Sequence, residues 1–251
     1  MTITFICCFN DRQQLESMLL PSLDKLVSKD EATGYKFNRI LIDNTGGRYR
    51  CASEAFNTEI ELHSEELGEI LVFLHQDIAF DDDRFFRHMI DFFSQHPNSV
   101  LGAAGMPEAG CTVSNLKYIK TKQYITPVQT EGVAEVCSVD ECCFAIPREL
   151  FQKLRFDEKT CFHWHLYAAD FCYDAKRRFG TGVYVLPDSI YHKQEEGGLG
   201  CDQYFLRTMW RMIRKYRKDF DSIYCSCYIV KTSFLPSVVH LAKSYVRNII
   251  K

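Results

Sequence analysis

The chain has 251 residues, of which 46% are apolar and 25% are charged, and its formal net charge is −3. This length can bury a full hydrophobic core, and the composition is that of a globular protein rather than a disordered or fibrous one. No apolar run reaches the roughly 20 residues of a membrane-spanning helix, and the N-terminus lacks the basic start and the cleavage site of a secretory signal.

The N-terminal part of the chain alternates apolar runs with amphipathic stretches. We predict buried strands at residues 3–9, 39–43 and 69–74, and helices at residues 12–29 and 51–67. Strands and helices that alternate at this short spacing indicate a parallel sheet with right-handed crossovers. Ligands bind such sheets beyond the carboxyl ends of the strands, which is where Asn10, Asp43 and Asp77 fall.

The rest of the chain continues the mixed pattern. Residues 105–133 are rich in Gly and Thr and predict an irregular loop or hairpin region. We predict strands at 136–146 and 183–187, and helices at 83–95, from 147 onward, at 166–178 and at 203–218. Residues 203–251 carry ten Lys or Arg and two Asp, a net charge of +8, which leaves −11 on the remainder.

The basic C-terminal segment has two interpretations. Its cationic and apolar side chains recur near helical spacing, so the helix can rest on an anionic membrane surface. Alternatively, it docks on the domain and exposes a solvated basic face. We expect no nucleic-acid partner.

Twelve cysteines are spread through the chain without a C-x-x-C pair. Several lie inside apolar runs, where free cysteine acts as a small buried hydrophobe. We interpret them as reduced core residues of a cytoplasmic protein, and a structural zinc site is the alternative.

The segment His75-Gln76-Asp77 follows directly after the strongly apolar strand predicted at residues 69–74. A carboxylate at the end of a buried strand can bind Mg²⁺ or Mn²⁺ while phosphate oxygens take other positions around the ion. The alternative is a loop aspartate that caps the next helix. The sequence contains neither G-x-G-x-x-G nor the P-loop motif, which disfavours dinucleotide-binding dehydrogenases and P-loop enzymes.

Several short blocks, in order, resemble GT-A-fold glycosyltransferases of family 2, especially the bacterial branch with His-Gln-Asp in place of Asp-x-Asp. The resemblance covers about residues 3–197, and its blocks are residues 4–10, 40–44, 55–57, 69–77, 139–141, 147–151, 156–158, 165–170 and 191–192. Two departures matter. Only Asp77 remains of the Asp-x-Asp carboxylates, and the family's Glu-Asp pair is Ala169-Asp170.

The resemblance implies a role for each matching residue. Asp170 corresponds to the base that takes a proton from the acceptor hydroxyl, and Asp77 with His192 corresponds to ligands of Mn²⁺ or Mg²⁺. The remaining implied contacts are Phe9, Asn10, Asp43, Asn57 and Gln76 with the nucleotide, and Asp140, Glu141, His163 and Trp164 with the acceptor or the donor sugar. Trp164 suits stacking on a sugar, or it packs on the core as part of a lid.

The expected fold is α/β: a GT-A domain over residues 1–200, with a mostly parallel central sheet and flanking helices, and a basic helical extension over 201–251. The expected function is an inverting glycosyltransferase with a nucleoside-diphosphate sugar as donor, and a UDP-sugar is the expected donor. Its acceptor would be a glycan or a lipid-linked molecule of bacterial capsule or lipopolysaccharide synthesis. Two alternatives stay open: a non-catalytic nucleotide-sugar-binding or scaffold protein, and a nucleotidyltransferase, although the glycine-rich first turn of the latter is absent.

Overall fold

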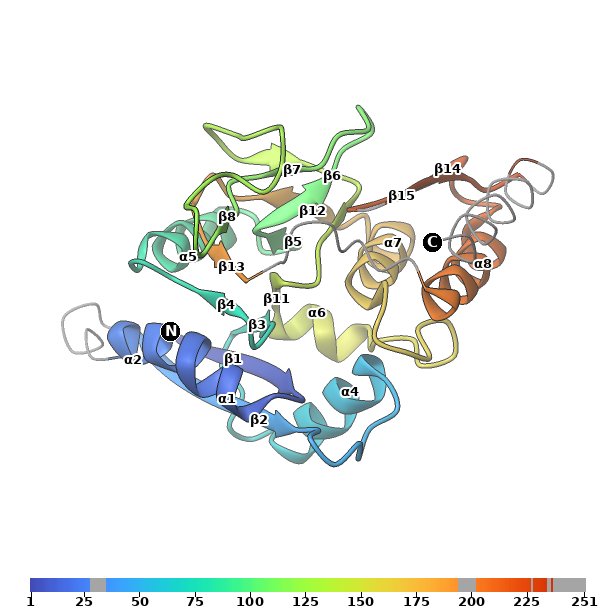
Figure 1. Cartoon of the computed structure of the whole chain (residues 1–251). Helices are drawn as coiled ribbons and strands as arrows, with labels where there is room; N and C mark the ends of the chain where they lie inside the picture. The colour runs from blue at the N-terminus through green and yellow to red at the C-terminus, as the bar shows by residue number, and fades with distance from the viewer. Residues whose placement is uncertain (28–34, 194–201, 227, 234–235, 237–251) are drawn as a thin grey trace.

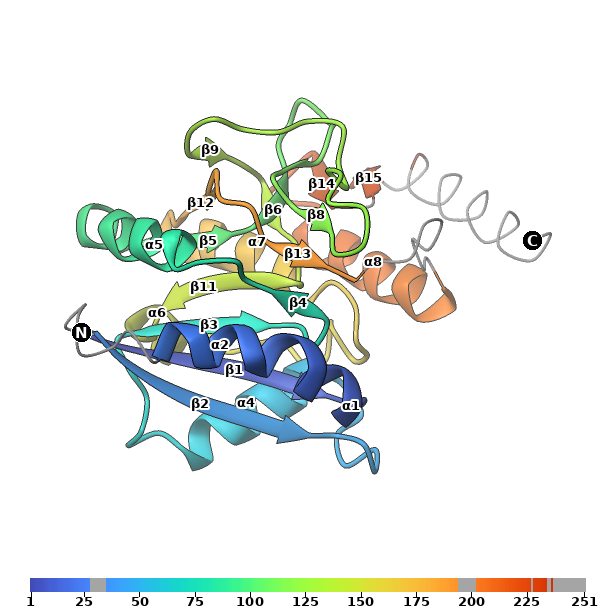
Figure 2. The ribbon, with the colours of Figure 1, turned by 60° about the vertical axis from the view of Figure 1, so that its left-hand side comes forward.

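The computed structural model of the chain describes residues 1–27, 35–193, 202–226, 228–233 and 236. A seven-stranded sheet forms its centre, in the order β2-β1-β3-β11-β5-β12-β9 (Figures 1 and 2). Five of the seven strands point the same way, and β11 and β9 run antiparallel to them. In that order the strands are Lys36–Asp43, Thr2–Phe9, Ile70–Leu74, Cys143–Pro147, Ser99–Gly102, Gly182–Val185 and Ala134–Glu135.

The three N-terminal strands form as the sequence predicts. All five residues of β3 are buried, because β1 pairs with it on one side and β11 on the other. A strand that is covered on both faces needs a continuous apolar run rather than an alternating one. The strands β1, β2 and β3 are mutually parallel, so Phe9, Asp43 and Leu74 end at the same edge.

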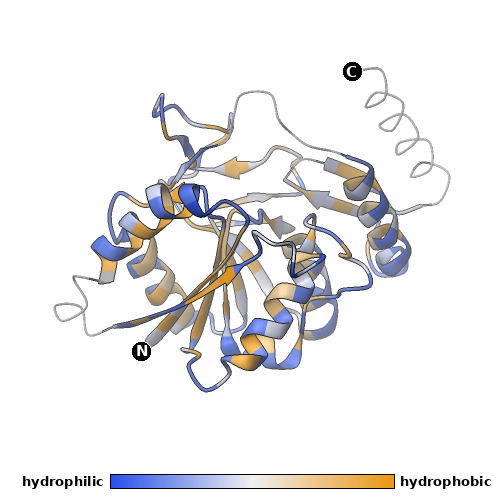
Figure 3. Cartoon of the chain, turned by 60° about the horizontal axis from the view of Figure 1, so that its bottom comes forward, coloured by the Kyte–Doolittle hydropathy of each residue, from blue (hydrophilic) through white to orange (hydrophobic). Residues whose placement is uncertain are grey.

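Helices cover both faces of this sheet (Figure 2). One face packs against η1 (Leu15–Leu19), α2 (Leu20–Val27) and α5 (Arg84–Gln95), and the short α1 (Arg12–Gln14) precedes them. The other face packs against α4 (Ala52–Leu62), α6 (Arg148–Lys153) and α7 (Tyr167–Phe179). Apolar colour follows the central strands and the inner helix faces, while the outer faces are polar (Figure 3). The helix predicted for 51–67 ends at Leu62.

The single strand predicted for residues 136–146 is wrong, because two separate strands occupy this range. β10 (Ser138–Val139) joins β6 (Ala104–Met106) and β7 (Val113–Ser114) in a second sheet, whereas β11 belongs to the central sheet. The chain turns between them at Asp140, whose Oδ1 accepts a hydrogen bond from the backbone N–H of Cys142 at 3.0 Å. The short strands β6 and β7, together with β8 (Lys117–Tyr118), lie in the region expected to be irregular.

A third small sheet brings together distant parts of the chain. β13 (Tyr191–His192) lies between β4 (Ile78–Ala79) and β8. It pairs antiparallel with β4, so His192 lies opposite Ile78. This pairing places His192 beside the segment that follows β3.

The C-terminal segment begins with α8 (Gln203–Tyr216), which the sequence predicts, and continues into an unpredicted hairpin of β14 (Ser222–Cys225) and β15 (Tyr228–Lys231). The apolar face of α8 packs on α7 and this hairpin, so α8 is docked on the domain. No helix in the described ranges has both the length and the apolarity to cross a bilayer. The domain boundary at residue 200 stays a prediction, and residues 237–251 lie outside the described part of the chain.

Candidate functional site

A cleft of about 580 Å³ lies beyond the carboxyl ends of β1, β2 and β3. It has one polar edge and one aromatic wall. Its lining residues are Cys8, Phe9, Asn10, Asn44, Thr45, Gly47, Ala52, Phe56, Leu74, His75, Gln76, Asp77, Trp164 and Tyr167. The position agrees with the rule for open α/β sheets, in which ligands bind outside the strand ends.

The turn after β1 is held by the side chain of Gln76. Its Oε1 accepts hydrogen bonds from the backbone N–H groups of Asn10 and Asp11, both at 3.0 Å, and its Nε2 donates to Asn10 Oδ1 at 2.8 Å. Both the oxygen and the nitrogen of the Gln76 side-chain amide are therefore hydrogen-bonded within the protein. In this geometry Gln76 shapes the turn that forms one side of the cleft, and its predicted nucleotide contact stays a prediction.

The turn after β2 also lines the cleft. Asn44 holds it closed: its Oδ1 accepts from Tyr49 N–H at 2.7 Å, and its amide donates to Tyr49 C=O at 3.2 Å. Gly47 has φ of +68°, a conformation that side chains disfavour and that glycine adopts without strain. Asn44, Thr45 and Gly47 therefore line the cleft, although the sequence analysis singled out only the neighbouring Asp43 for this turn.

Asp43 itself is not among the residues that line the cleft. Its Oδ1 accepts hydrogen bonds from the backbone N–H of Thr45 at 2.9 Å and from the Thr45 hydroxyl, and its Oδ2 pairs with Arg12. These hydrogen bonds from Thr45, and then Arg12, lower the pKa of Asp43. The carboxylate is thus ionised and fixes the start of the turn.

Aromatic side chains form the wall across from the polar edge. Trp164 comes from the loop before α7, and Tyr167 and Phe56 come from α7 and α4. The Tyr167 hydroxyl lies 3.4 Å from His75 Nε2. Flat aromatic faces beside hydrogen-bonding turns can accommodate a planar base or the apolar face of a sugar.

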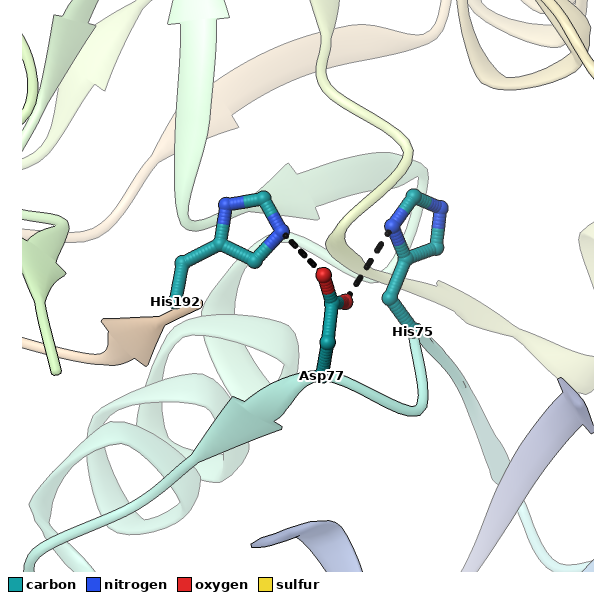
Figure 4. Close-up of side chains that lie close together, drawn as sticks. All are labelled: His75, Asp77 and His192. Carbon is teal, nitrogen blue, oxygen red and sulfur yellow. Dashed lines mark ion pairs between the residues drawn. The ribbon is translucent and has the colours of Figure 1, made fainter. Parts of the chain in front are cut away.

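His75, Asp77 and His192 converge beside the cleft (Figure 4). His75 Nδ1 lies 3.8 Å from Asp77 Oδ1, and His192 Nε2 lies 3.3 Å from Asp77 Oδ2. One potential ligand atom from each residue lies within 4.8 Å of the others. In the part of the chain that the structure describes, this is the one such cluster, and it contains no cysteine.

The electrostatics of the cluster follow from burial and mutual charge. Desolvation lowers the pKa of His75, so this ring is neutral near pH 7. Burial also disfavours charge on His192, but its hydrogen bond to Asp77 and the charge of Asp77 outweigh that effect and raise its pKa. Burial likewise opposes ionisation of Asp77, yet His192 and His75 together lower its pKa.

These residues fit a divalent ion by the chemistry of their donors. Two imidazole nitrogens and one carboxylate suit a first-row transition ion better than Mg²⁺, which prefers oxygen ligands alone. Three protein ligands also leave coordination positions for oxygens of another molecule. The donor set is therefore compatible with a divalent ion, the kind of cofactor expected from the sequence.

Asp170 lies away from the cleft. Only 2% of its side chain is exposed, and both carboxylate oxygens accept hydrogen bonds from Lys215 Nζ, at 2.9 and 3.0 Å. The Tyr216 hydroxyl donates to Asp170 Oδ1 at 2.8 Å. Burial raises the pKa of Asp170 to about 6, although the charge of Lys215 opposes this rise. Its role as a base stays a prediction. That role requires the ion pair between Asp170 and Lys215 to break.

The remaining predicted residues surround the cleft rather than line it. Asn57 joins α4 to the segment before α7, because its Oδ1 accepts from Phe156 N–H at 3.1 Å and its amide donates to Phe156 C=O at 2.9 Å. The charge of Asp140 opposes the lowering of the His75 pKa and contributes to the raised pKa of His192.

Glu141 lies in the turn before β11, and its carboxyl accepts hydrogen bonds from backbone N–H groups at the N-terminus of α7. Burial, and then the charge of Asp140, raise its pKa to about 8, against the opposing effect of the backbone N–H groups of Leu166 and Tyr167. Its Oε1 is buried without a hydrogen-bond partner among the described residues. Leu166 has φ of +66°, which is costly for a residue with a side chain.

The strand order, the helices on both faces and the cleft at the strand ends define the GT-A fold, as the sequence resemblance predicts. One similar solved structure is GalNAc-T7 with UDP, GalNAc and Mn²⁺, with a TM-score of 0.56 and 13% identity. Another is the mannosyltransferase PcManGT from Pyrobaculum calidifontis in complex with GDP-Man and Mn²⁺, with a TM-score of 0.55 and 12% identity.

Each comparison covers 87% of this chain, but only 48% of the GalNAc-T7 chain and 64% of the PcManGT chain. At this low identity the similarity establishes the fold and nothing finer. No family model and no curated protein matches the sequence.

Proposed function

We propose that this protein is a metal-dependent glycosyltransferase that uses a nucleoside-diphosphate sugar as its donor. The observation that carries the proposal is the His75, Asp77 and His192 cluster beside the cleft, at the strand ends of a GT-A fold. A planar base fits between the turns after β1 and β2, which orients the diphosphate toward the cluster. The similar structures hold UDP or GDP-Man with Mn²⁺, and we propose a UDP-sugar as the donor here.

The residues of this chain then have separable tasks. The turns held by Gln76 and Asn44 would bind the nucleoside, and Trp164 and Tyr167 would bind the base or the sugar through their faces. Asp77, His75 and His192 would hold the ion, which supplies positive charge to stabilise the departing diphosphate. We further propose, from the sequence resemblance to family 2, that transfer inverts the anomeric centre.

The acceptor and its location are proposals from the sequence. We propose a glycan or lipid-linked acceptor of bacterial surface polysaccharide synthesis, at the cytoplasmic face of the membrane. The exposed residues Arg207, Arg214, Arg217 and Lys218 on and just after α8 supply a basic surface for this contact. Flotation with vesicles of anionic phospholipid tests the contact, and absence of binding at low salt would contradict it.

A second candidate is a nucleotide-sugar-binding protein without transferase activity. It is favoured by the burial of Asp170 against Lys215 and by the lining of the cleft, in which Asp77 is the one carboxylate. General base catalysis needs a group within hydrogen-bonding reach of the acceptor hydroxyl. Binding of a nucleotide sugar without any release of nucleoside diphosphate would support this candidate.

The test is a thermal-shift matrix of nucleoside diphosphates and nucleotide sugars, each with and without Mn²⁺. A ligand at about 100 times its Kd stabilises the folded state by about 2.7 kcal/mol. We expect stabilisation by one nucleotide class, dependent on Mn²⁺, and loss of the dependence in Asp77→Asn. Asp91→Asn, an exposed position on α5, is the control and should behave as the wild type. If no nucleotide stabilises the protein in either condition, the proposal is wrong.

A further inference from the structure

The loop that carries Trp164 is held by α8 through the residues on both sides of the tryptophan. The His163 ring stacks face to face on Tyr204, with centroids 4.1 Å apart and planes 1° apart. His165 Nε2 lies 3.3 Å from Asp202 Oδ1. Because Trp164 stands between two anchored neighbours, the position of its backbone depends on α8.

A third contact fixes the same loop further upstream. The Arg211 guanidinium lies 3.9 Å from the centroid of the Phe162 ring and donates a hydrogen bond to the backbone C=O of Lys159. Phe162 also contacts the edge of Tyr204, with centroids 6.4 Å apart. The loop from 159 to 165 is therefore attached to α8 at four of its residues.

The helix itself is firmly anchored to the domain. Its side chains Phe205, Met209, Met212 and Tyr216 are buried against α7 and the C-terminal hairpin. Lys215, near its end, lies 3.0 Å from Asp157 Oδ2 and 2.9 Å from Asp170 Oδ2. A rigid support of this kind can fix the side chains that it contacts.

We propose that α8 positions Trp164 at the wall of the cleft, and that Tyr204 is the positioning residue through which it acts. The sequence of this helix is compatible with a membrane contact or with a docked helix that has a solvated face. The contacts of Asp202 and Tyr204 with the loop give the start of α8 a further role, which is to set the shape of the proposed nucleotide-sugar site. The ligand class rests on the proposed function, whereas the coupling of Tyr204 to Trp164 does not.

The nature of the contact identifies the informative substitutions. Desolvation, and then His165, lower the pKa of His163, so two uncharged rings stack. Such a pair contributes through its faces, so Tyr204→Phe should retain the function and Tyr204→Ala should lose it. Gln203→Ala changes the preceding, exposed residue of the same turn and serves as the matched control.

Trp164 fluorescence gives a direct measurement. The chain has two tryptophans, so the variants are compared in a Trp210→Phe background, where Trp164 is the one emitter. We expect Tyr204→Ala to shift the emission to the red and to raise acrylamide quenching about twofold. We also expect it to weaken nucleotide binding by up to about tenfold, the factor that an aromatic pair can contribute. Tyr204→Phe and Gln203→Ala should change neither quantity.

The outcomes separate this inference from the proposed function. If Tyr204→Ala leaves quenching and affinity unchanged, or if Tyr204→Phe alters them equally, the positioning role is refuted. If the parent protein binds no nucleotide but Tyr204→Ala still exposes Trp164, the proposed function fails and the coupling stands. Should Tyr204→Ala fail to fold by circular dichroism, His163→Ala removes the same stack from the loop side and must reproduce its effect.

Discussion

Lys215 lies among three carboxylates, and replacing it with methionine tests how α8 is held. Its Nζ lies 2.9 Å from Asp170, 3.0 Å from Asp157 and 3.7 Å from Asp174. Methionine keeps most of the length of the side chain and removes the charge. Asp170, with 2% of its side chain exposed, would then be buried as an anion without its partner.

The expected loss is large because the surviving charge cannot reach water. Removing one partner of a buried ion pair costs about 3–5 kcal/mol. Lys215 keeps 16% of its side chain exposed, so we expect the lower part of that range. The free energy of unfolding at pH 7.5 should fall by about 3 kcal/mol in Lys215→Met.

The loss of unfolding free energy in Lys215→Met should also be smaller at low pH than at pH 7.5. The folded-state pKa of Asp170 is about 6, above the ordinary value of about 3.9 for an unfolded chain. Ionisation of Asp170 therefore opposes folding above pH 6, and this penalty disappears as the pH falls toward 4. Without Lys215 the folded-state pKa rises further, so the variant should regain part of the lost stability between pH 7.5 and 5.

Urea unfolding followed by far-UV circular dichroism, at pH 7.5 and at pH 5, measures both effects. Arg214→Met, an exposed change at the preceding position of α8, should stay within about 0.5 kcal/mol of the wild type. A loss below about 1 kcal/mol, or a loss of the same size at both pH values, would refute the reasoning. In the double variant with Asp170→Asn, which has no buried charge at this position, the pH dependence should largely vanish.

Three further predictions follow from single contacts. Gly68→Ala should lower the unfolding free energy by about 2–3 kcal/mol or more, because a Cβ there would lie 2.2 Å from the carbonyl oxygen of Thr2. Gly46 has open space around it, so Gly46→Ala should lower the unfolding free energy far less in the same urea titration. Asn57→Ala should lower stability by about 1–3 kcal/mol by leaving the Phe156 backbone without its partner, and an unchanged nucleotide Kd would argue against the predicted nucleotide contact. Asp170→Asn should retain nucleotide binding and lose release of nucleoside diphosphate from the donor, and retained turnover would remove Asp170 as the base.

The sequence predicts best the elements whose signal is local. Residues 70–74 form a continuous apolar run, and residues 3–9 are interrupted only by Thr4, because these strands are covered on both faces. The polar residues that follow the two strands line the cleft at the carboxyl edge of the sheet. The break at Asp140 is harder to predict, since the apolar residues on either side of it belong to different sheets. β14 alternates half-buried and buried residues, but it is only four residues long, so its signal in the sequence is weak.

The roles of the polar side chains depend on partners that are remote in the chain. Gln76 contacts a turn 66 residues earlier, and Lys215 reaches Asp170 across 45 residues of sequence. No spacing rule links such pairs. Sequence analysis could therefore place Asp77 and His192 in a common site through resemblance, but not the partners that hold Gln76 and Asp170.

The pairing of β4 with β13 makes the approach of His192 to Asp77 depend on a very short ladder. Only Tyr191 and His192 pair with β4, and Lys193 N–H adds a hydrogen bond to Asp77 C=O at 3.0 Å. So few hydrogen bonds allow this ladder to open locally while the central sheet stays intact. An ion bound by Asp77 and His192 would link the two strands. Metal binding should therefore slow hydrogen–deuterium exchange at the amides of residues 191–193 and leave exchange in β3 unchanged.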